Sequence, residues 1–346
     1  MAFWQYSTRK KIAPHYGVIM RTMTSLLFRC CVVLVAFVAP VHALDSEHCT
    51  LEQQASVDLQ DEADGSPLVS VTIDGHSFTM ILDTASALTW ISPDAARQLG
   101  LRTLPWPDRL PEINLGGIPI QRYMEVKGFR LGSTSLKEVD VVVSPKFGHW
   151  NATESAGVLG MDTLSGFDIE LDLAHHKLNL FSPDHCPGKV VYWADAYQSL
   201  PMKLSPLGIY YFPMELNGRK LETLFASGNA STTLPTDVTR QLYHFDKSSP
   251  EVEVEKNPRG GTVDVYRAMA LTANDGNLTI LNARIRLTDP STNSCRLALR
   301  GGVIGYDDEC LGRFPLRLGT NVLSKLRLYL SIKDKMLYFT DAEAHR

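Results

Sequence analysis

The sequence predicts an all-β protein built from two similar lobes around a cleft. The first observation is a repeat at an offset of 143 positions, in which two segments of one half match two of the other: Asp74-Gly75 with Asn217-Gly218, and Arg97-Gln98-Leu99 with Arg240-Gln241-Leu242. The second is a series of short apolar runs bounded by turn residues, which is typical of strands and hairpins. A duplicated unit of this size is a domain and not a solenoid repeat.

The strands are clearest in the first copy. Leu68 to Ile73 and Phe78 to Leu82 flank the turn Asp74-Gly75, which predicts a β-hairpin. Val139 to Val143 and Phe167 to Leu171 alternate or run apolar in the manner of strands.

One short helix is expected in each copy, after Asp83-Thr84-Ala85-Ser86 in the first and after the matching residues from Ala226 in the second; we call these two segments the central motifs. Ser92-Pro93 favours a helix start and Gly100 a helix end, and Pro235 lies at the matching place in the second copy. Asp94 and Asp237 would then lie in first helical turns, where a carboxylate complements the helix dipole.

The N-terminal residues have the order of a secretory signal. Positions 1–43 carry five basic residues and no acidic one, and an apolar stretch of ten residues, Cys30 to Ala39, leads to a small-residue site ending at Ala43. This order predicts cleavage after Ala43 and export to a periplasmic or secreted location. The chain could start at Met20 or Met23. An uncleaved membrane anchor is the alternative, although the apolar stretch is short for a membrane span.

Charge excludes one class of function. The chain has 34 basic and 38 acidic residues, a net charge of −4, and without the five basic residues of the predicted signal this becomes 29 − 38 = −9. An acidic domain without a basic cluster is a poor nucleic-acid binder. We therefore expect no nucleic-acid partner and, after cleavage, no stable membrane span.

Four cysteines would remain after cleavage: Cys49, Cys186, Cys295 and Cys310. An even number in an exported chain favours disulfides, and three pairings are possible. We favour Cys49 with Cys186, which closes the first copy at both ends, and Cys295 with Cys310, which closes a local loop. A metal site using the neighbouring His48 and His185 is the alternative, but no C-x-x-C spacing supports zinc.

The offset between the copies grows along the chain. It is 144 residues at Leu115-Gly116-Gly117 and 159 at Val158-Leu159-Gly160, so the second copy has 159 − 144 = 15 extra residues, in the interval that contains Cys295 and Cys310. The predicted organisation is a signal peptide 1–43, an N-terminal segment 44–54, a first lobe 55–182, a linker 183–200 and a second lobe 201–342.

Asp83 opens the central motif of the first copy. It follows the apolar run Met80-Ile81-Leu82 and begins Asp83-Thr84-Ala85-Ser86, and Val158-Leu159-Gly160 follows 75 residues later. Gly116-Gly117 lies between them, bounded by polar strands. An Asp-Thr pair alone is more often a turn or a helix cap. The ordered set of three motifs is more specific.

These motifs resemble those of the retropepsin-like and pepsin-like aspartic peptidases. Judged by Gly157 to Leu164, the chain looks closest to exported bacterial proteins with tandem retropepsin-like lobes. The resemblance implies two pseudo-symmetric lobes, a peptide or protein substrate, and no metal or organic cofactor. By position it assigns these roles: Asp83 as the catalytic carboxylate, Thr84 and Ala85 in the supporting turn, Ser86 as a hydrogen-bond partner of the carboxylate, and Gly116 and Gly117 as the tip of a flap.

The second copy lacks the aspartate. Adding 143 to Asp83 gives Ala226, which is followed by Ser227 and Gly228. The family uses two facing carboxylates that share one proton, because adjacent carboxylates cannot both ionise. A lone Asp83 is expected to titrate at about pKa 4 unless burial raises its pKa. Since general acid–base help is worth about 10²–10⁴-fold, loss of the partner should nearly silence a monomeric enzyme.

Three alternatives follow from the missing carboxylate. Asp237 could supply it, although we favour a helix-dipole role for that residue. Two chains could form a homodimer and face their Asp83 residues. The chain could instead be an inactive pseudopeptidase that binds peptides as a regulatory module. Our main hypothesis is an aspartic-type peptidase impaired by Ala226, and a structural protein of the cell envelope is a further alternative, because fold does not fix function.

Overall fold

The structure is a computed structural model that describes residues 50–344 apart from 109–112, 116–117, 137, 146–154, 258–259, 274–277, 291–296 and 307–313. The described residues belong to one unit of the chain, His48–Arg346. We call residues 55–182 the first segment and residues 201–342 the second segment.

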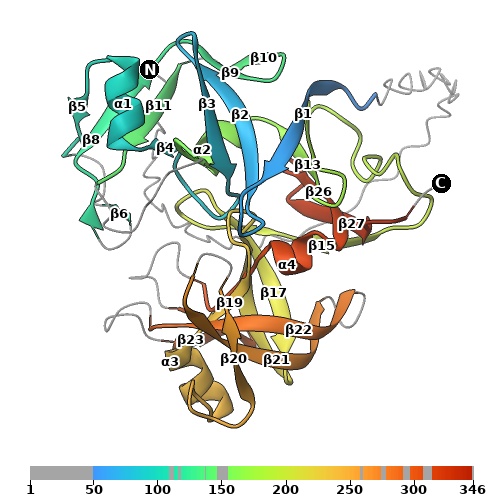
Figure 1. The fold of residues 1–346 in the computed structure, drawn as a ribbon. Helices are drawn as coiled ribbons and strands as arrows, with labels where there is room; N and C mark the ends of the chain where they lie inside the picture. The colour runs from blue at the N-terminus through green and yellow to red at the C-terminus, as the bar shows by residue number, and fades with distance from the viewer. Residues whose placement is uncertain are drawn as a thin grey trace, which may run out of the picture. The chain divides into compact units, whose positions relative to one another are not determined.

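The described residues form mainly strands, as the sequence predicts, in three sheets (Figure 1). Strands of the 15-stranded sheet are, in order of pairing, β15 (Gln198–Pro201), β27 (Met336–Asp341), β26 (Leu326–Ser331), β13 (Asp168–Asp172), β14 (Lys177–Phe181), β1 (Gln53–Asp61), β2 (Pro67–Ile73), β3 (His76–Leu82), β12 (Gly157–Leu159), β4 (Trp90–Ile91), β11 (Val139–Val143), β8 (Arg122–Val126) and β5 (Leu104–Pro105). In addition, β9 (Phe129–Leu131) pairs with β2, and β10 (Thr134–Leu136) pairs with β9.

The second segment supplies the 10-stranded sheet. Its strands are, in order of pairing, β16 (Lys203–Leu204), β17 (Tyr210–Leu216), β21 (Thr262–Ala273), β22 (Leu278–Thr288), β19 (Thr232–Pro235), β25 (Leu316–Leu318), β18 (Arg219–Phe225), β24 (Val303–Tyr306) and β23 (Leu297–Arg300), with β20 (Val252–Lys256) beside β21. The third sheet is the pair β6 (Asn114–Leu115) and β7 (Ile118–Pro119).

The predicted hairpin is present, and the second segment contains its counterpart. Strands β2 and β3 are joined by Asp74-Gly75, with φ of 45° and 86°, and β17 and β18 by Asn217-Gly218, with φ of 49° and 75°. Two-residue turns with positive φ fit the twist of paired strands, and Asp, Asn and Gly tolerate that backbone conformation.

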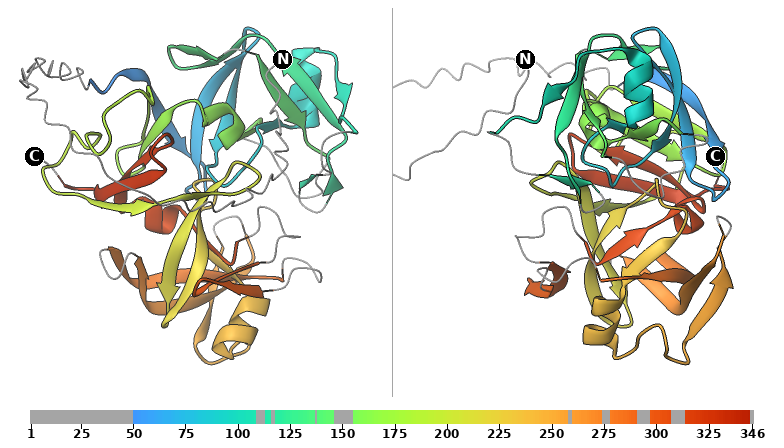
Figure 2. Two further views of the ribbon diagram at one scale, coloured as in Figure 1. Left: turned by 180° about the vertical axis from the view of Figure 1, so that it is seen from behind. Right: turned by 60° about the vertical axis from the view of Figure 1, so that its left-hand side comes forward.

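The largest sheet contains strands from both segments. Strand β26 of the second segment pairs with β13 of the first through contacts such as Ile169 with Leu330 and Leu171 with Leu328. Figures 1 and 2 show the red strands of residues 326–341 beside the yellow-green strand β13. Strand β15, which begins within the predicted linker, pairs with β27 on the far side. The predicted lobe boundaries therefore fall inside one sheet.

Short helices follow the central motifs. Helix α1 (Pro93–Leu99) begins where expected, since the Ser92 Oγ accepts a hydrogen bond from the Ala95 N–H at 3.2 Å, and it ends at Gly100 with φ of 64°. The second segment has α3 (Thr236–Val238) followed by the π-helix η1 (Thr239–Tyr243). The described residues also include two single-turn helices, α2 (Met161–Leu164) and α4 (Thr320–Leu323).

Several predicted features lie outside the described residues. Gly116 and Gly117 are among them, although β6 and β7 on either side do pair as a hairpin. Cys186 is disulfide-bonded, whereas Cys49, Cys295 and Cys310 lie outside the described residues. The proposed disulfide pairing stays a prediction.

Candidate active site

Asp83 directly follows β3 and begins a turn that backbone hydrogen bonds hold in place. The Asp83 N–H donates to the Leu159 carbonyl oxygen at 3.1 Å, and the Ser86 N–H donates to the Asp83 carbonyl oxygen at 3.2 Å. Strand β12, which carries Leu159, runs parallel to β3. The apolar run and the apolar-apolar-Gly triplet are therefore neighbouring strands, and Asp83 as a whole is half-buried where they end.

The turn at Ala226 has the same construction. The Ala226 N–H donates to the Leu318 carbonyl oxygen at 2.9 Å, and the Asn229 N–H donates to the Ala226 carbonyl oxygen at 2.9 Å. Strand β25, which carries Leu318, runs parallel to β18. The side chain at this place is a fully buried methyl group.

The two turns are joined by hydrogen bonds that run in both directions. The Thr84 Oγ1 donates to the Phe225 carbonyl oxygen at 2.8 Å, and the Ser227 Oγ donates to the Leu82 carbonyl oxygen at 2.8 Å. The Thr84 N–H donates to the Ser227 Oγ at 3.0 Å and the Ser227 N–H to the Thr84 Oγ1 at 3.4 Å. These atoms are buried, so each bond satisfies a group that water does not reach.

Asp83 receives one backbone donor from each turn. The N–H groups of Ala85 and Gly228 donate to the same oxygen, Oδ1, at 2.9 and 3.3 Å. The turns approach so closely that a Cβ added to Gly228 would lie 2.6 Å from the Asp83 Cβ. Glycine at position 228 is what permits this contact.

The carboxyl of Asp83 has opposing influences on its pKa. Burial raises the pKa above its ordinary value, while the N–H donors of Ala85 and Gly228 and the positive charge of Arg317 act in the opposite direction. Such a group holds a proton at a higher pH than an exposed aspartate does. Perturbed carboxyls of this kind are found at functional sites.

A threonine supports each glycine of the two triplets. The Gly160 N–H donates to the Thr89 Oγ1 at 3.0 Å, and the Gly319 N–H donates to the Thr232 Oγ1 at 3.1 Å. A Cβ on Gly160 would lie 2.6 Å from the Leu88 carbonyl carbon. These glycines allow the strands to pass directly behind the two turns.

Each threonine is held in turn by a side chain from the following helix. The Thr89 N–H donates to both carboxylate oxygens of Asp162, at 2.8 and 2.9 Å. The Thr232 N–H donates to the Asn321 Oδ1 at 2.7 Å. The two networks differ in one side-chain group, which is the carboxylate of Asp162 in the first and the amide of Asn321 in the second.

The structure corrects one predicted contact. Ser86 was expected to hydrogen-bond the carboxylate, but its Oγ donates to the Leu88 carbonyl oxygen at 2.8 Å. A hydroxyl has one proton to donate, and here the adjacent backbone receives it. The donors on Asp83 are instead the backbone N–H groups of Ala85 and Gly228.

Sequence reasoning did not find several residues of the site. It named Ser227 only as a remnant of the second motif, and it assigned no role to Thr89, Asp162 or Arg317. A signal was available for Ser227, because Thr84 plus 143 is position 227 and both side chains carry a hydroxyl. Asp237 lies in the first turn of α3, as expected.

Comparison with known proteins links part of the chain to one family. Residues 69–163 match the model of a family described as aspartyl protease. This range includes the Asp83 turn, β6, β7 and the triplet ending at Gly160. A comparison with curated proteins gave no match. Within the described part of the chain, no helix has the length and apolar character needed to cross a membrane.

Proposed function

We propose that this protein is an aspartic-type peptidase in which Asp83 is the only catalytic carboxylate, and that it cleaves peptide or protein substrates slowly. The match of residues 69–163 to the aspartyl protease family supports the reaction class. One observation carries the assignment: Asp83 accepts an N–H from each turn on one oxygen. That arrangement fixes the carboxylate at the junction of the two segments.

The reaction needs Asp83 in its ionised form. The carboxylate accepts a proton from water as the water oxygen attacks the peptide carbonyl carbon, and Asp83 then returns that proton to the peptide nitrogen as the C–N bond breaks. In a two-carboxylate enzyme the protonated partner polarises that carbonyl, and Ala226 cannot. The rate is therefore expected to be about 10²–10⁴-fold below that of a two-carboxylate site. Because the pKa of Asp83 is raised, turnover should increase with pH until this group is ionised.

A monomer is the proposed active form. A homodimer facing two Asp83 residues would require the partner's turn to contact Thr84 and Asp83. The chain's own turn already occupies that face, since Ser227 hydrogen-bonds Thr84 and Gly228 hydrogen-bonds Asp83. We also propose that the protein is exported after loss of residues 1–43, which the disulfide at Cys186 supports.

The test is cleavage of a mixed peptide library from pH 3 to 7. We compare the mature wild type with Asp83→Asn and, as a control, Asp94→Asn, whose carboxylate is 79% exposed in α1. Cleavage lost only in Asp83→Asn is the expected result. Equal cleavage by wild type and Asp83→Asn would contradict the assignment.

The second candidate is a peptide-binding module without turnover. The buried Ala226 favours it, because the place of the second carboxylate holds a methyl group that neither donates nor accepts a proton. This candidate predicts that the library is retained by the protein but remains intact at every pH. Retention should weaken when Asp83 is replaced if peptides lie across the carboxylate.

A further inference from the structure

Strand β13 carries three buried carboxylates on one face. Asp168, Glu170 and Asp172 alternate along the strand, so their side chains point the same way, and they are 0%, 0% and 3% exposed. Buried carboxylates need partners, because the loss of hydration is costly. The structure provides those partners from outside β13.

Arg327 of β26 is the main partner. Its Nε and Nη2 donate to the Glu170 Oε1 at 2.9 and 2.6 Å, and its Nε lies 3.4 Å from the Asp172 Oδ2. The Tyr192 hydroxyl donates to the other Glu170 oxygen at 2.6 Å. Since β13 belongs to the first segment and β26 to the second, these contacts join the two segments.

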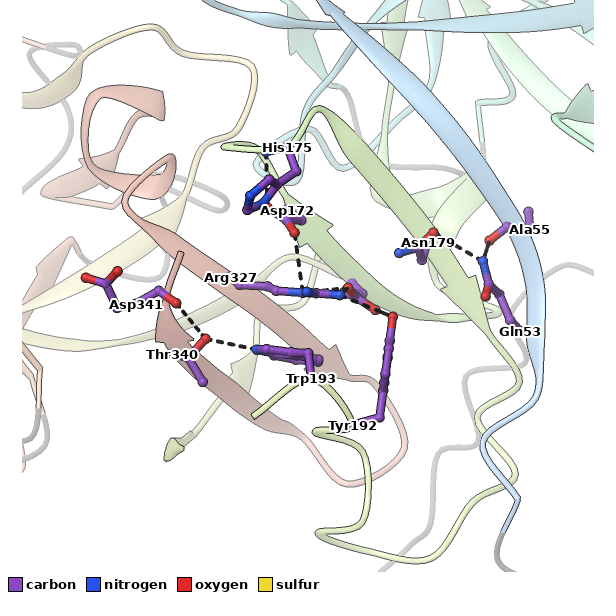
Figure 3. Close-up of polar contacts among 11 residues, drawn as sticks. Gln53, Ala55, Asp172, His175, Asn179, Tyr192, Trp193, Arg327, Thr340 and Asp341 are labelled. Atoms are coloured by element: carbon purple, nitrogen blue, oxygen red, sulfur yellow. Dashed lines mark hydrogen bonds and ion pairs between the residues drawn. The ribbon is translucent and has the colours of Figure 1, made fainter. Parts of the chain in front are cut away.

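Aromatic side chains cover the guanidinium. Its central carbon lies 4.5 Å from the centroid of the Trp193 ring and 5.6 Å from that of the Tyr192 ring. Figure 3 shows the guanidinium extended over the Trp193 indole, between Asp172 and Tyr192. The Trp193 Nε1 is held by the Thr340 Oγ1 at 2.9 Å. Arg327 is thus a nearly enclosed cation, with its side chain 18% exposed.

Further charged and titratable groups surround these carboxylates, including Tyr210 and Tyr338, which interact electrostatically with Asp168. His185 contacts Asp168 at 2.5 Å, and His175 contacts Asp172 at 2.8 Å. Lys177 pairs with Asp58, and Lys333 pairs with Asp184 at 3.4 Å. Tyr329 lies beside Asp168 and Glu170. Of these partners, His175 and Lys177 belong to the first segment, His185 to the connecting residues 183–200, and Lys333 and Tyr329 to the second segment. Arg327 of the second segment contacts both Glu170 and Asp172 of the first. Tyr329 and the Ile332 N–H of the second segment also lie against these carboxylates, the latter donating to the Asp168 Oδ1 at 2.8 Å.

The same strands lead directly from the site. Helix α2, whose Met161 N–H donates to the Ser86 carbonyl oxygen at 2.8 Å, is followed by β13. Helix α4, whose Thr320 N–H donates to the Asn229 carbonyl oxygen at 2.8 Å, is followed by β26. The paired strands β13 and β26 are therefore each one short connection away from a helix that contacts one of the two turns.

We propose that Arg327, Glu170 and Asp172 form an acid-released clamp between the two segments, which holds β13 and β26 together near neutral pH and loosens them as the carboxylates become protonated. The ion pairs of Arg327 support loosening at acid pH. Although burial opposes its charge, Glu170, Tyr192 and Asp172 raise the pKa of Arg327 above its ordinary value. The cation therefore persists when acid neutralises its carboxylate partners. An enclosed, unpaired charge is strongly unfavourable.

Hydrogen exchange tests the clamp without reference to peptide cleavage. We would measure protection factors, corrected for the intrinsic pH dependence, for the backbone amides of β13 and β26 from pH 7 to 3.5. The amides of β2 and β3, which pair within the first segment, serve as the internal reference. In the wild type we expect protection of β13 and β26 to fall about tenfold or more between pH 7 and pH 3.5, before protection of β2 and β3 is lost.

Two variants sharpen the test. Glu170→Gln keeps the shape and removes the charge, so protection of β13 and β26 should already be low at pH 7 and change little with pH. Asp184→Asn removes an ion-pair partner that is 95% exposed and should follow the wild type. The proposal is overturned if wild-type β13 and β26 stay protected at pH 3.5, or if they lose protection together with β2 and β3. It is also overturned if folded Glu170→Gln follows the wild-type pH profile.

Discussion

Asp83 and Ala226 occupy corresponding places in two turns of the same construction, and they differ by one carboxyl group. The Asp83 N–H donates a hydrogen bond to the Leu159 carbonyl oxygen, and the Ala226 N–H donates one to the Leu318 carbonyl oxygen. The turn geometry therefore does not require an acid at either place. It requires only a short side chain that leaves the two turns in contact.

Restoring a carboxylate at position 226 should increase cleavage, provided that space is made for it. Gly228 permits the close approach to Asp83, and the matching residue in the first turn is Ala85, which has a Cβ. We expect Ala226→Asp together with Ala85→Gly to raise turnover by about 10²-fold or more, and Ala226→Asp alone to give less. The double variant combined with Asp83→Asn is the control, and unchanged turnover in the double variant would contradict the proposed correspondence.

Gly228→Ala should damage the site. The added Cβ would meet the Cβ and carboxyl carbon of Asp83 at 2.6 and 2.7 Å, so the turns must separate. We expect a loss of about 1–3 kcal/mol in the free energy of unfolding, measured by urea denaturation. Gly166→Ala is the matched control, since a Cβ there meets nothing within 4 Å. Equal stability of the two variants would show that the turns can part at little cost.

At the scale of elements, β12 with α2 and β25 with α4 build the same support behind the two turns. Thr89 and Asp162 support the backbone at Gly160, and Thr232 and Asn321 support it at Gly319. The acid and the amide accept the same backbone hydrogen bond. Only the acid introduces a dependence on pH.

Asp162→Asn should alter the pH dependence of stability. Burial raises the pKa of Asp162 above its ordinary value, although hydrogen bonds from Thr89 and Thr163 lower it. The folded state therefore favours the protonated acid, and this stabilisation is full below the unfolded pKa of about 4 and is lost as pH rises through the folded pKa. The asparagine does not titrate.

We therefore expect the stability of Asp162→Asn relative to wild type to improve as pH rises from 3 to 7. Urea denaturation at several pH values measures this difference. Asp94→Asn, which removes an exposed carboxylate, should show a smaller trend. A constant difference across the range would mean that Asp162 does not titrate between the two states.

At the scale of the whole molecule, two of the contacts that join the described segments involve backbone hydrogen bonding. One is the continuous sheet across β13 and β26. The other is the buried hydrogen bonding between the turns, where Thr84 and Ser227 exchange donors and acceptors.

Ser227→Ala should weaken this junction. It would leave the buried Thr84 N–H and the Leu82 carbonyl oxygen without the Ser227 hydroxyl, at a cost of about 1–3 kcal/mol in unfolding free energy. Ser227→Thr keeps the hydroxyl and should recover most of the loss. If alanine and threonine variants are equally stable, the hydroxyl does not contribute to the junction.

The sequence predicted the elements more fully than the contacts between them. The hairpin at Asp74-Gly75 and the helix capped by Ser92 follow from local backbone preferences, so they could be predicted. The bond from Ser86 to Leu88 could not, because two acceptors competed for one hydroxyl proton. The role of Arg327 was also missed, since its partner Glu170 lies 157 positions away.

By itself the sequence determined the β-strand class, the turns and the repeat that places Ala226 where Asp83 recurs. Each of these depends on residues close together in the chain or on a constant offset. Only the tertiary structure decided which donors reach the carboxylate, how Thr84 and Ser227 join the turns, and that β26 extends the sheet of the first segment. The reason is physical: hydrogen bonding and burial depend on distances between atoms of distant residues, and local backbone preferences do not fix those distances.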